Sequence, residues 1–423
     1  MMRVRALRWV LLAVAVVGLG TAAAWSARLA VADAWFQKET VEATEKALAW
    51  SPDQAAYSLR LALMLSDSDP AKASAALHRA LALNPHDAQA WIELGLHYEA
   101  DGDLPQAELS LRRAAEESHL YLPRWTLMNY YFRRNDAASF WYWAKAAVPM
   151  IWGDPLPLFR LCGRMEEDGE LIDRLDIRKP ELQAKYLFYL LDAGRPDLVG
   201  PSTRHLLEDN EEADAPLLLD ACDRLLDAKR TGDAQRIWNK LIVGHRLPEG
   251  RPPGASGTLL YNGDFTLPPT GRGFDWRLPP LEGISAAREE SPVGLRLTFS
   301  GAEPEEAEPL AQLAPVEEKT AYELTFRYRT SAIEAGAGLS WRIGDATHGS
   351  RIAAGESLAS EEEVERRIPF VTPPGCRLVR IALGYQRRAG VTRISGFLVL
   401  RNVELRPSAQ PPSEDPLRSR VMK

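Results

Sequence analysis

The hydrophobic pattern divides the chain into an apolar N-terminal stretch, a helical half and a strand-rich half. Residues 9–27 (WVLLAVAVVGLGTAAAWSA) carry no charge, and from about 33 to 245 apolar positions recur with a helical period. After a Pro- and Gly-rich stretch the period becomes two, which is typical of half-buried strands. The pattern therefore predicts three parts with different folds.

The uncharged stretch is long enough to cross a membrane once. As a helix it spans roughly 28 Å, close to the thickness of a bilayer core. Arg3, Arg5 and Arg8 precede it and only Arg28 follows closely, so the positive-inside rule places the N-terminus in the cytoplasm. We expect residues 1–30 to form a cytoplasmic tip and a single-pass anchor in a bacterial inner membrane, with the bulk of the chain in the periplasm.

Two other readings of this stretch remain open. The small residues 22–24 (AAA) offer a site that a signal peptidase accepts, and a buried helix of a soluble protein is a further alternative. No cysteine follows the apolar run closely, so a lipoprotein anchor is not predicted.

A repeat with a period of 34 residues organises the helical half. Four pairs lie 34 positions apart, namely Tyr57 and Trp91, Ala73 and Ala107, Leu77 and Leu111, and Ala80 and Ala114. A shorter echo relates residues 47–52 to 80–85, so the array begins soon after the anchor. Trp125 continues the period from Trp91, but Trp141 and Lys145 replace the next small and apolar positions. A third repeat is therefore expected to be helical but divergent.

Two later stretches also predict helical hairpins. Residues 181–208 turn at 194–196 (GRP), and residues 214–243 turn at 231–233 (TGD). A single hairpin cannot bury its apolar face alone, so we expect a solenoid of roughly five to six stacked hairpins over residues 33–245.

The spacing within the best repeat resembles that of the tetratricopeptide family. The residues that carry the resemblance are Trp91, Leu94, Gly95, Tyr98, Ala107, Leu111 and Ala114. Gly95 and Ala107 are small where two antiparallel helices approach closely, and Trp91 and Tyr98 fill the gap between hairpins. The resemblance implies a concave surface that binds a protein partner.

Aromatic residues are dense between residues 121 and 152. They are Tyr121, Trp125, Tyr130, Tyr131, Phe132, Phe140, Trp141, Tyr142, Trp143 and Trp152. They form either an exposed strip for a ligand or the packing of divergent hairpins. Consecutive helical residues point about 100° apart, so at least one of Trp141, Tyr142 and Trp143 should be exposed, and these three are candidates for partner binding.

The C-terminal half predicts an antiparallel β-sandwich. After a linker at 246–257, apolar and polar residues alternate within five segments, at 294–300, 322–329, 338–343, 377–385 and 397–405. About nine short strands over 258–407 fit a jelly roll, followed by a disordered tail at 408–423. The fold class is thus multidomain, with a transmembrane helix, an all-α tetratricopeptide-like solenoid and an all-β jelly-roll sandwich.

The two ends of this domain carry a second resemblance. Residues 259–265 (LLYNGDF) lead in and residues 403–405 (VEL) end the last strand, a layout similar to carbohydrate-binding modules and their galactose-binding-like relatives. In those folds the last strand closes beside the first. The resemblance implies glycan binding.

The segment 273–277 (GFDWR) supplies candidates for a glycan site. Trp276 could stack on a sugar while Asp275 and Arg277 bind its hydroxyls. Trp341 and Tyr385 lie in strand patterns and are further candidates. The alternative is that Trp276 closes one end of the sandwich core and Arg277 pairs with a carboxylate.

No cofactor is predicted, and a structural calcium ion is the one metal alternative. Asn262, Asp264 and Glu404 near the domain ends could hold it, although calcium takes six to eight oxygen ligands. The seven histidines are scattered, and the three cysteines are too far apart for a zinc site or a disulfide framework.

The net charge and the absence of known catalytic motifs argue against several classes of function. The formal net charge is −7, so the chain lacks the overall excess of positive charge that is typical of nucleic-acid-binding proteins. The sequence contains no nucleophile elbow, phosphate loop or dinucleotide fingerprint, and the glutamates at 303–308 and 361–365 are typical of solvated loops and strand edges.

These observations predict a non-catalytic, membrane-anchored periplasmic scaffold. Its solenoid would bind a protein partner of an envelope or exopolysaccharide assembly system, and its sandwich would bind a glycan. A glycan-processing enzyme with two carboxylates on the sandwich, and a purely structural scaffold, are the alternatives.

Overall fold

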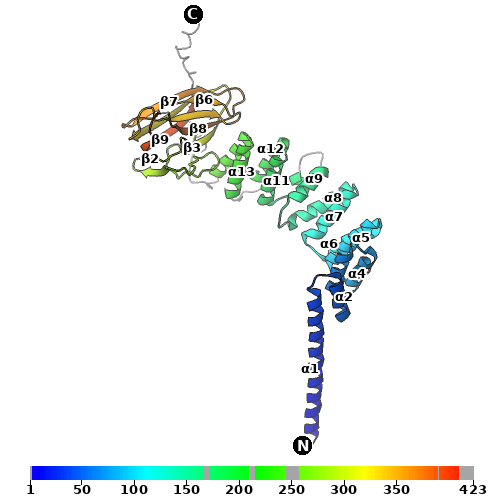
Figure 1. Cartoon of the computed structure of the whole chain (residues 1–423). Helices are drawn as coiled ribbons and strands as arrows, with labels where there is room; N and C mark the ends of the chain where they lie inside the picture. The colour runs from blue at the N-terminus through cyan, green and yellow to red at the C-terminus, as the bar shows by residue number, and fades with distance from the viewer. Residues whose placement is uncertain (1, 166–170, 209–214, 244–256, 389, 409–423) are drawn as a thin grey trace. The chain divides into compact units, whose positions relative to one another are not determined.

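The computed structural model confirms the predicted fold class: helices fill the N-terminal half and two antiparallel sheets follow (Figure 1). It describes residues 2–165, 171–208, 215–243, 257–388 and 390–408. Apart from Gly257 and Ser408, the predicted linker and tail lie outside these residues. The chain divides into two compact units, Met1–Ile177 and Arg178–Lys423.

The first unit consists of helices. They are α1 (Met2–Phe36), α2 (Val41–Trp50), α3 (Ala55–Leu65), α4 (Pro70–Leu83), α5 (Ala88–Ala100), α6 (Leu104–Glu117), α7 (Tyr121–Arg133), α8 (Ala137–Ala147), the 3-10 helix Val148–Met150, α9 (Leu156–Met165) and α10 (Leu171–Leu175). Aspartates begin several of them, because a carboxylate accepts hydrogen bonds from the free backbone N–H groups of the first turn. These N-caps are Asp69, Asp87, Asp103 and Asp136.

Helix α1 is long and apolar enough to span a membrane, but it does not end where the uncharged stretch ends. It continues to Phe36 and packs on α2 (Figure 1). Ala32 on α1 is fully buried against Ala47 of α2 and Tyr57 of α3. The C-terminal end of α1 is therefore the first helix of the repeat array.

Polar contacts also hold this end of α1. The Arg28 side chain donates a hydrogen bond to the Trp50 carbonyl, and the Tyr57 hydroxyl donates one to Asp33. The Phe36 and Tyr57 rings lie 4.5 Å apart. Burial, together with the bond to Asp33, raises the pKa of Tyr57 to about 12, so the hydroxyl remains a donor at any physiological pH.

The best repeat packs as its spacing predicts. Ala107, Leu111 and Ala114 on α6 are fully buried and Leu94 is nearly so, while Trp91 and Tyr98 are half-buried. A Cβ atom on Gly95 would lie 2.7 Å from the Leu111 side chain, so α5 and α6 approach too closely for a larger residue.

The third repeat follows a different register from the one that Trp125 indicates. The buried positions of α8 are Phe140, Ala144 and Ala147, each 33 residues after Ala107, Leu111 and Ala114. The continuation of the period at Trp125 is therefore off by one residue. Phe140 occupies the place of the small Ala107, and the next residue, Trp141, packs against Arg174, whose guanidinium carbon lies 4.3 Å from the ring centre.

The second unit begins with the two predicted hairpins. They are α11 (Pro180–Asp192) with α12 (Pro196–Glu208), and α13 (Ala215–Asp227) with α14 (Thr231–Val243). The turn of the second hairpin lies at residues 228–230, just before the predicted one, and residues 231–233 form the first turn of α14.

A β-sandwich completes the second unit. Its strands are β1 (Ile284–Glu290), β2 (Val293–Ser300), β3 (Glu306–Pro315), β4 (Ala321–Ser331), β5 (Leu339–Asp345), β6 (Arg351–Ala354), β7 (Val364–Val371), β8 (Leu378–Gln386) and β9 (Ser395–Pro407). Five strands form one sheet in the order β1-β2-β9-β4-β7, and four form the other in the order β3-β8-β5-β6. All pairs are antiparallel. The core lies between the sheets.

The lead-in segment lies beside the last strand, as predicted. The Leu259 amide donates to the Leu405 carbonyl at 2.8 Å, and the Val403 amide donates to the Gly263 carbonyl at 2.8 Å. A side chain on Gly263 would overlap the Val403 carbonyl. Only glycine therefore allows the two segments to approach this closely.

The repeat packing generates the first prediction. Ala107→Trp should lower the free energy of unfolding of the first unit by about 1–3 kcal/mol or more, because the ring overpacks a sealed contact. Leu109→Trp is the matched control on the same helix, since Leu109 is 62% exposed, and it should change stability by less than about 0.5 kcal/mol. Thermal denaturation measures both, and equal melting temperatures would contradict the packing of α6 on α5.

Candidate functional site

The rings predicted as a sugar platform lie inside the sandwich core. Trp276, Trp341 and Tyr385 are fully buried. The ring centre of Trp276 lies 5.5 Å from that of Phe265 and 6.2 Å from that of Trp341. Its Nε1 donates a hydrogen bond to the Asn262 carbonyl at 3.0 Å. A ring without an exposed face cannot stack on a sugar, so the platform role has no support here. Trp276 closes the core, which is the alternative stated above.

Asp275 holds the conformation of the loop that contains it. Its carboxylate is fully buried and accepts hydrogen bonds from the backbone N–H groups of Thr270 (2.7 Å) and Trp276 (2.8 Å). Burial raises the pKa of this carboxyl, against the opposing effect of those hydrogen bonds. Asp275 is therefore placed to shape its own loop, and its oxygens are not free for a ligand.

Arg277 faces helix α13 instead of a ligand. Its guanidinium lies 3.4 Å from Asp223, and burial lowers its pKa. The neighbouring Arg272 also pairs with Asp223 and reaches Asp220, and the Gly273 amide donates to Asp223 at 2.7 Å. One loop of the sandwich is thus fixed to two aspartates of the last hairpin.

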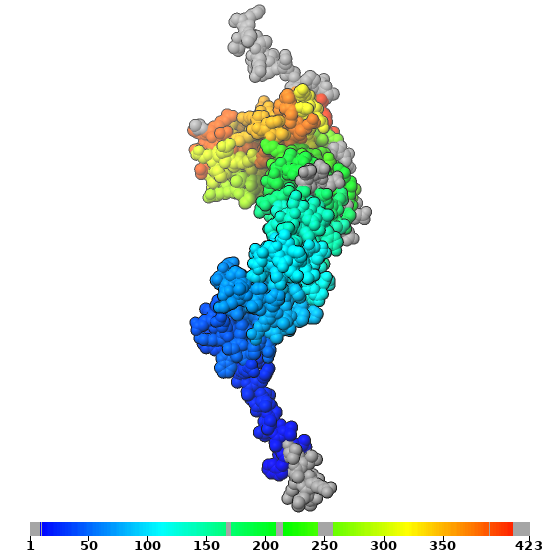
Figure 2. All heavy atoms as spheres, turned by 90° about the vertical axis from the view of Figure 1, so that its right-hand side faces the viewer, coloured from blue at the N-terminus to red at the C-terminus, as the bar shows by residue number. Residues whose placement is uncertain are grey.

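An indole completes this junction. Trp238 on α14 is fully buried, with its ring 5.2 Å from that of Tyr261 and 5.9 Å from that of Phe274. Gly273 lies flat against the indole, since a Cβ atom there would overlap its six-membered ring. We call Trp238, Asp223 and the loop 270–277 the docking junction; Figure 2 shows the green helices against the sandwich.

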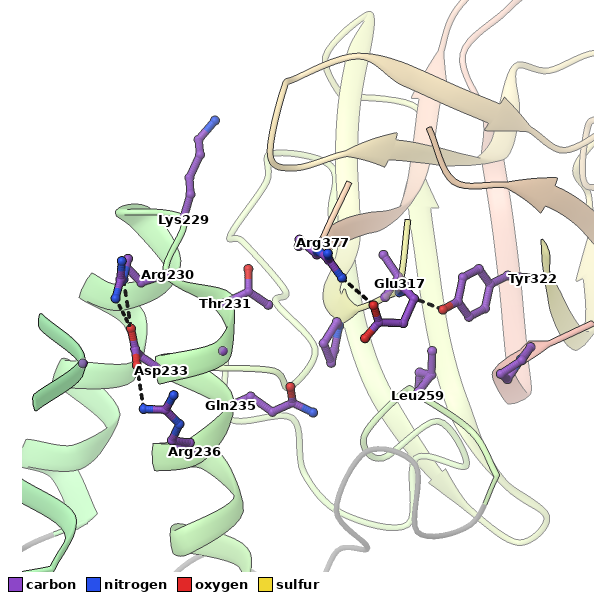
Figure 3. A pocket seen from close by; sticks show the side chains of 15 residues that line it. Lys229, Arg230, Thr231, Asp233, Gln235, Arg236, Leu259, Glu317, Tyr322 and Arg377 are labelled. Carbon is purple, nitrogen blue, oxygen red and sulfur yellow. Dashed lines mark hydrogen bonds and ion pairs between the residues drawn. The ribbon is translucent and has the colours of Figure 1, made fainter. Parts of the chain in front are cut away.

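A cleft of about 710 Å³ lies beside the docking junction, between α14 and the sandwich (Figure 3). Its walls are charged but paired. Arg230 and Arg236 both pair with Asp233, at 2.8 and 2.9 Å, and Arg377 pairs with Glu317. Its apolar lining consists of Leu259, Pro315, Val316, Tyr322 and Pro407. The cleft offers apolar contact, but its main cations are already satisfied.

A second hollow lies on the outer face of the four-stranded sheet. We call it the arginine trough, and its polar lining includes Ser340, Arg342, Arg351, Ser357, Gln386 and Arg388. Its volume is about 470 Å³. An adjoining hollow of about 450 Å³ shares Arg342, Arg351 and Gln386 and adds Glu306 and Glu308.

Two of the carboxylates beside the trough, Glu306 and Glu308, are engaged by arginines. Arg342 lies 3.1 Å from Glu306, and Arg380 pairs with Glu308. Within the described part of the chain, Arg351 and Arg388 have no carboxylate partner. The trough therefore holds cationic groups that are free to meet an anion.

The predicted partner-binding residues of α8 differ in exposure. Tyr142 is 66% exposed, while Trp141 and Trp143 are half-buried, which confirms that at least one of the three is exposed. Leu120 and Leu122 at the start of α7, and Trp152 after α8, are also exposed, at 71%, 53% and 92%. Because α7 and α8 are antiparallel neighbours, the start of α7 lies near the end of α8.

The oxygens considered for calcium have other partners. The Asn262 side chain bonds to the backbone of Leu267, Asp264 accepts from Thr266, and Glu404 pairs with Arg406. Across the described residues, no group of three or more His, Cys, Asp or Glu could hold a metal ion. The three cysteines are buried free thiols.

Comparison with known proteins found similar solved structures for each of the two parts. The chain matches no family model and no curated protein. Its helical part is similar in structure to YrrB, described as a TPR protein with an unusual peptide-binding site, at 16% identity over 49% of this chain and 94% of that one, with a TM-score of 0.26.

The sandwich is similar to two carbohydrate-binding modules. One is a CBM4 structure, at 11% identity over 35% of this chain and 98% of that one, with a TM-score of 0.28. The other is TmCBM61 in complex with β-1,4-galactotriose, at 14% identity over 36% of this chain and 99% of that one, with a TM-score of 0.27.

Sequence reasoning missed the docking junction and the trough. The partners of the 273–277 segment lie about 50 residues earlier, at Asp223, and no periodicity connects them. The trough arginines come from different strands and loops, so only sheet pairing brings them together. A clue to the junction was that Trp238 occurs in a predicted amphipathic helix next to the linker.

Two glycines of the same loop test the docking junction. Gly273→Ala and Gly271→Ala both place a Cβ atom at positive φ, which destabilises each by about 1–2 kcal/mol. Only Gly273→Ala also overlaps Trp238, since Gly271 has open space around it. We expect Gly273→Ala to lose about 1–3 kcal/mol more than Gly271→Ala in denaturant unfolding. Equal losses would show that the loop does not dock on the indole.

Proposed function

We propose that this chain is a membrane-anchored, non-catalytic binding protein. Its helical repeats bind a segment of a protein partner, and its sandwich binds a glycan of the cell envelope. The observation that carries the proposal is the group of exposed large apolar residues around the third repeat, namely Leu120, Leu122, Tyr142 and Trp152. We propose that these side chains form one patch, because a large exposed apolar patch marks an interaction site.

The proposed location is supported by α1 and its flanking charges. A helix of membrane length preceded by Arg3, Arg5 and Arg8 orients the N-terminus toward the cytoplasm of a bacterium. The repeats and the sandwich then lie in the periplasm, close to the inner membrane. This is where an envelope or exopolysaccharide assembly system operates, and we place the protein there as a scaffold.

Catalysis is less well supported than binding. A glycosidase needs two carboxylates that are free to act as acid and base, and the carboxylates Glu306 and Glu308 beside the trough are paired with arginines. One similar structure is an enzymatically active tailspike domain, with a TM-score of 0.27, which leaves the fold compatible with either role. A sandwich that binds nothing is the third candidate.

Photocrosslinking in living cells tests the repeat surface. A benzophenone amino acid in place of Tyr142 or Trp152 should give a crosslinked species of one defined mass, because both positions face the partner. The matched control replaces Lys72, an exposed residue of α4, and should give none. Identical products from all three positions, or none from any, would contradict a binding surface at the third repeat.

Fusion proteins test the membrane topology. Alkaline phosphatase at the C-terminus should be active, because the enzyme folds only in the periplasm, and a fusion after Arg8 should be inactive. The chain should stay in the membrane after carbonate extraction and keep its first residues. A soluble form that begins after Ala24 would instead establish a cleaved signal peptide, and an inactive C-terminal fusion would reverse the orientation.

A further inference from the structure

The shape of the arginine trough depends on small residues of its sheet. A side chain on Gly384 would overlap the side chain of Arg342. Because Gly384 has no side chain, the Arg342 guanidinium can lie across the strand at this position. Gly338 has a φ of +93° and closely approaches the Gln386 carbonyl. These glycines therefore let the Arg342 side chain and the Gln386 backbone come closer than residues with a side chain would allow.

The trough is strongly cationic for a chain of net charge −7. Four guanidinium groups line it, from Arg342, Arg351, Arg387 and Arg388. Two of them have carboxylate partners, Arg342 with Glu306 and Arg387 with Glu305. The other two have none in the described part of the chain, which leaves a local excess of positive charge.

Uncharged polar groups alternate with these cations. Ser340 and Gln386 line the same hollow, and Ser357 accepts a hydrogen bond from the Gly336 amide at 3.2 Å, which leaves its hydroxyl proton to donate. The site therefore combines groups that bind an anion with groups that bind neutral hydroxyls. Together they match a ligand that carries both.

We propose that the arginine trough binds an acidic glycan, a polysaccharide whose sugars carry carboxylates. Guanidinium groups bind carboxylates through two parallel hydrogen bonds. In the proposed complex, Arg351 and Arg388 bind the carboxylates of the sugars in this way. The serines and the glutamine bind the sugar hydroxyls. This proposal rests on the glycan-binding half of the proposed function and names its ligand class.

The lining distinguishes a glycan from other polyanions. None of the described residues that line the trough is aromatic, whereas binding of single-stranded nucleic acid relies on aromatic platforms for its bases. The rings that could have served, Trp341 and Tyr385 of the same sheet, point into the core and are fully buried. A mostly polar lining also gives no recess for a lipid chain or the apolar side chains of a peptide.

Matched pairs of oligosaccharides test the proposal. The full chain in nanodiscs of phosphatidylcholine is titrated with oligogalacturonate and with its methyl ester, which has the same backbone without the charge. Alginate oligomers provide a second acidic backbone, and oligo-dT provides a polyanion without sugars of this kind. We expect the acidic oligosaccharides to bind at least about tenfold more tightly than the ester, and their affinity to fall as salt rises.

Two variants identify the residues. The double variant Arg351→Gln with Arg388→Gln should weaken binding of the acidic oligosaccharides by at least about tenfold, because each substitution removes a charge-assisted hydrogen bond. Arg366→Gln is the matched control, since Arg366 is an exposed arginine of β7 in the other sheet. It should leave the affinity within about twofold, and both variants should keep the melting temperature of the parent.

Each outcome decides the proposal. Equal binding of the acid and its ester, equal binding of oligo-dT, or an unaltered affinity in the double variant would overturn the acidic-glycan site. If only the ester or another neutral oligosaccharide bound, glycan binding would stand and the site would lie elsewhere. If no saccharide bound, the glycan half of the proposed function would fail as well.

Discussion

The burial of one indole, Trp238, holds the second unit together. The last helical hairpin of a repeat array exposes an apolar face that needs a cover, and here the sandwich supplies it through Tyr261 and Phe274. Asp223 adds charge pairing at the rim of the same contact. The loop that meets this helix also delivers Trp276 to the core, so docking and sandwich closure depend on the same few residues.

This dependence explains why the segment 273–277 supported two roles in the sequence, a sugar site or a plug of the core, of which the structure shows the second. An aromatic residue between an aspartate and an arginine suits a sugar site, and it equally suits a loop that must fill a core and meet two carboxylates. What decides between these two roles is the pairing of the loop with Asp220 and Asp223, which lie about 50 residues earlier in the chain. Local patterns identify which side chains are distinctive, and tertiary pairing decides what they contact.

Elements with an uninterrupted period were predictable, and the others were not. The alternation of β4 and the small residues of α6 appear directly in the sequence, because each position faces one way. Strand β3 was not predicted from alternation, because a bulge between Ala307 and Leu310 shifts its register and interrupts the period of two. The third repeat was not predictable either, because its buried positions follow those of α6 at 33 residues instead of 34. The arginine trough has no period at all.

The continuity of α1 with the repeats has a mechanical consequence. Because Ala32, Asp33 and Phe36 are packed against α2 and α3, the apolar helix α1 continues into the first hairpin without a break. A change in bilayer thickness alters the tilt of a transmembrane helix, and here that tilt would turn the first hairpin with it. In the membrane-anchored state that we propose, α1 would then act as a lever arm that passes changes of its tilt to the first repeats.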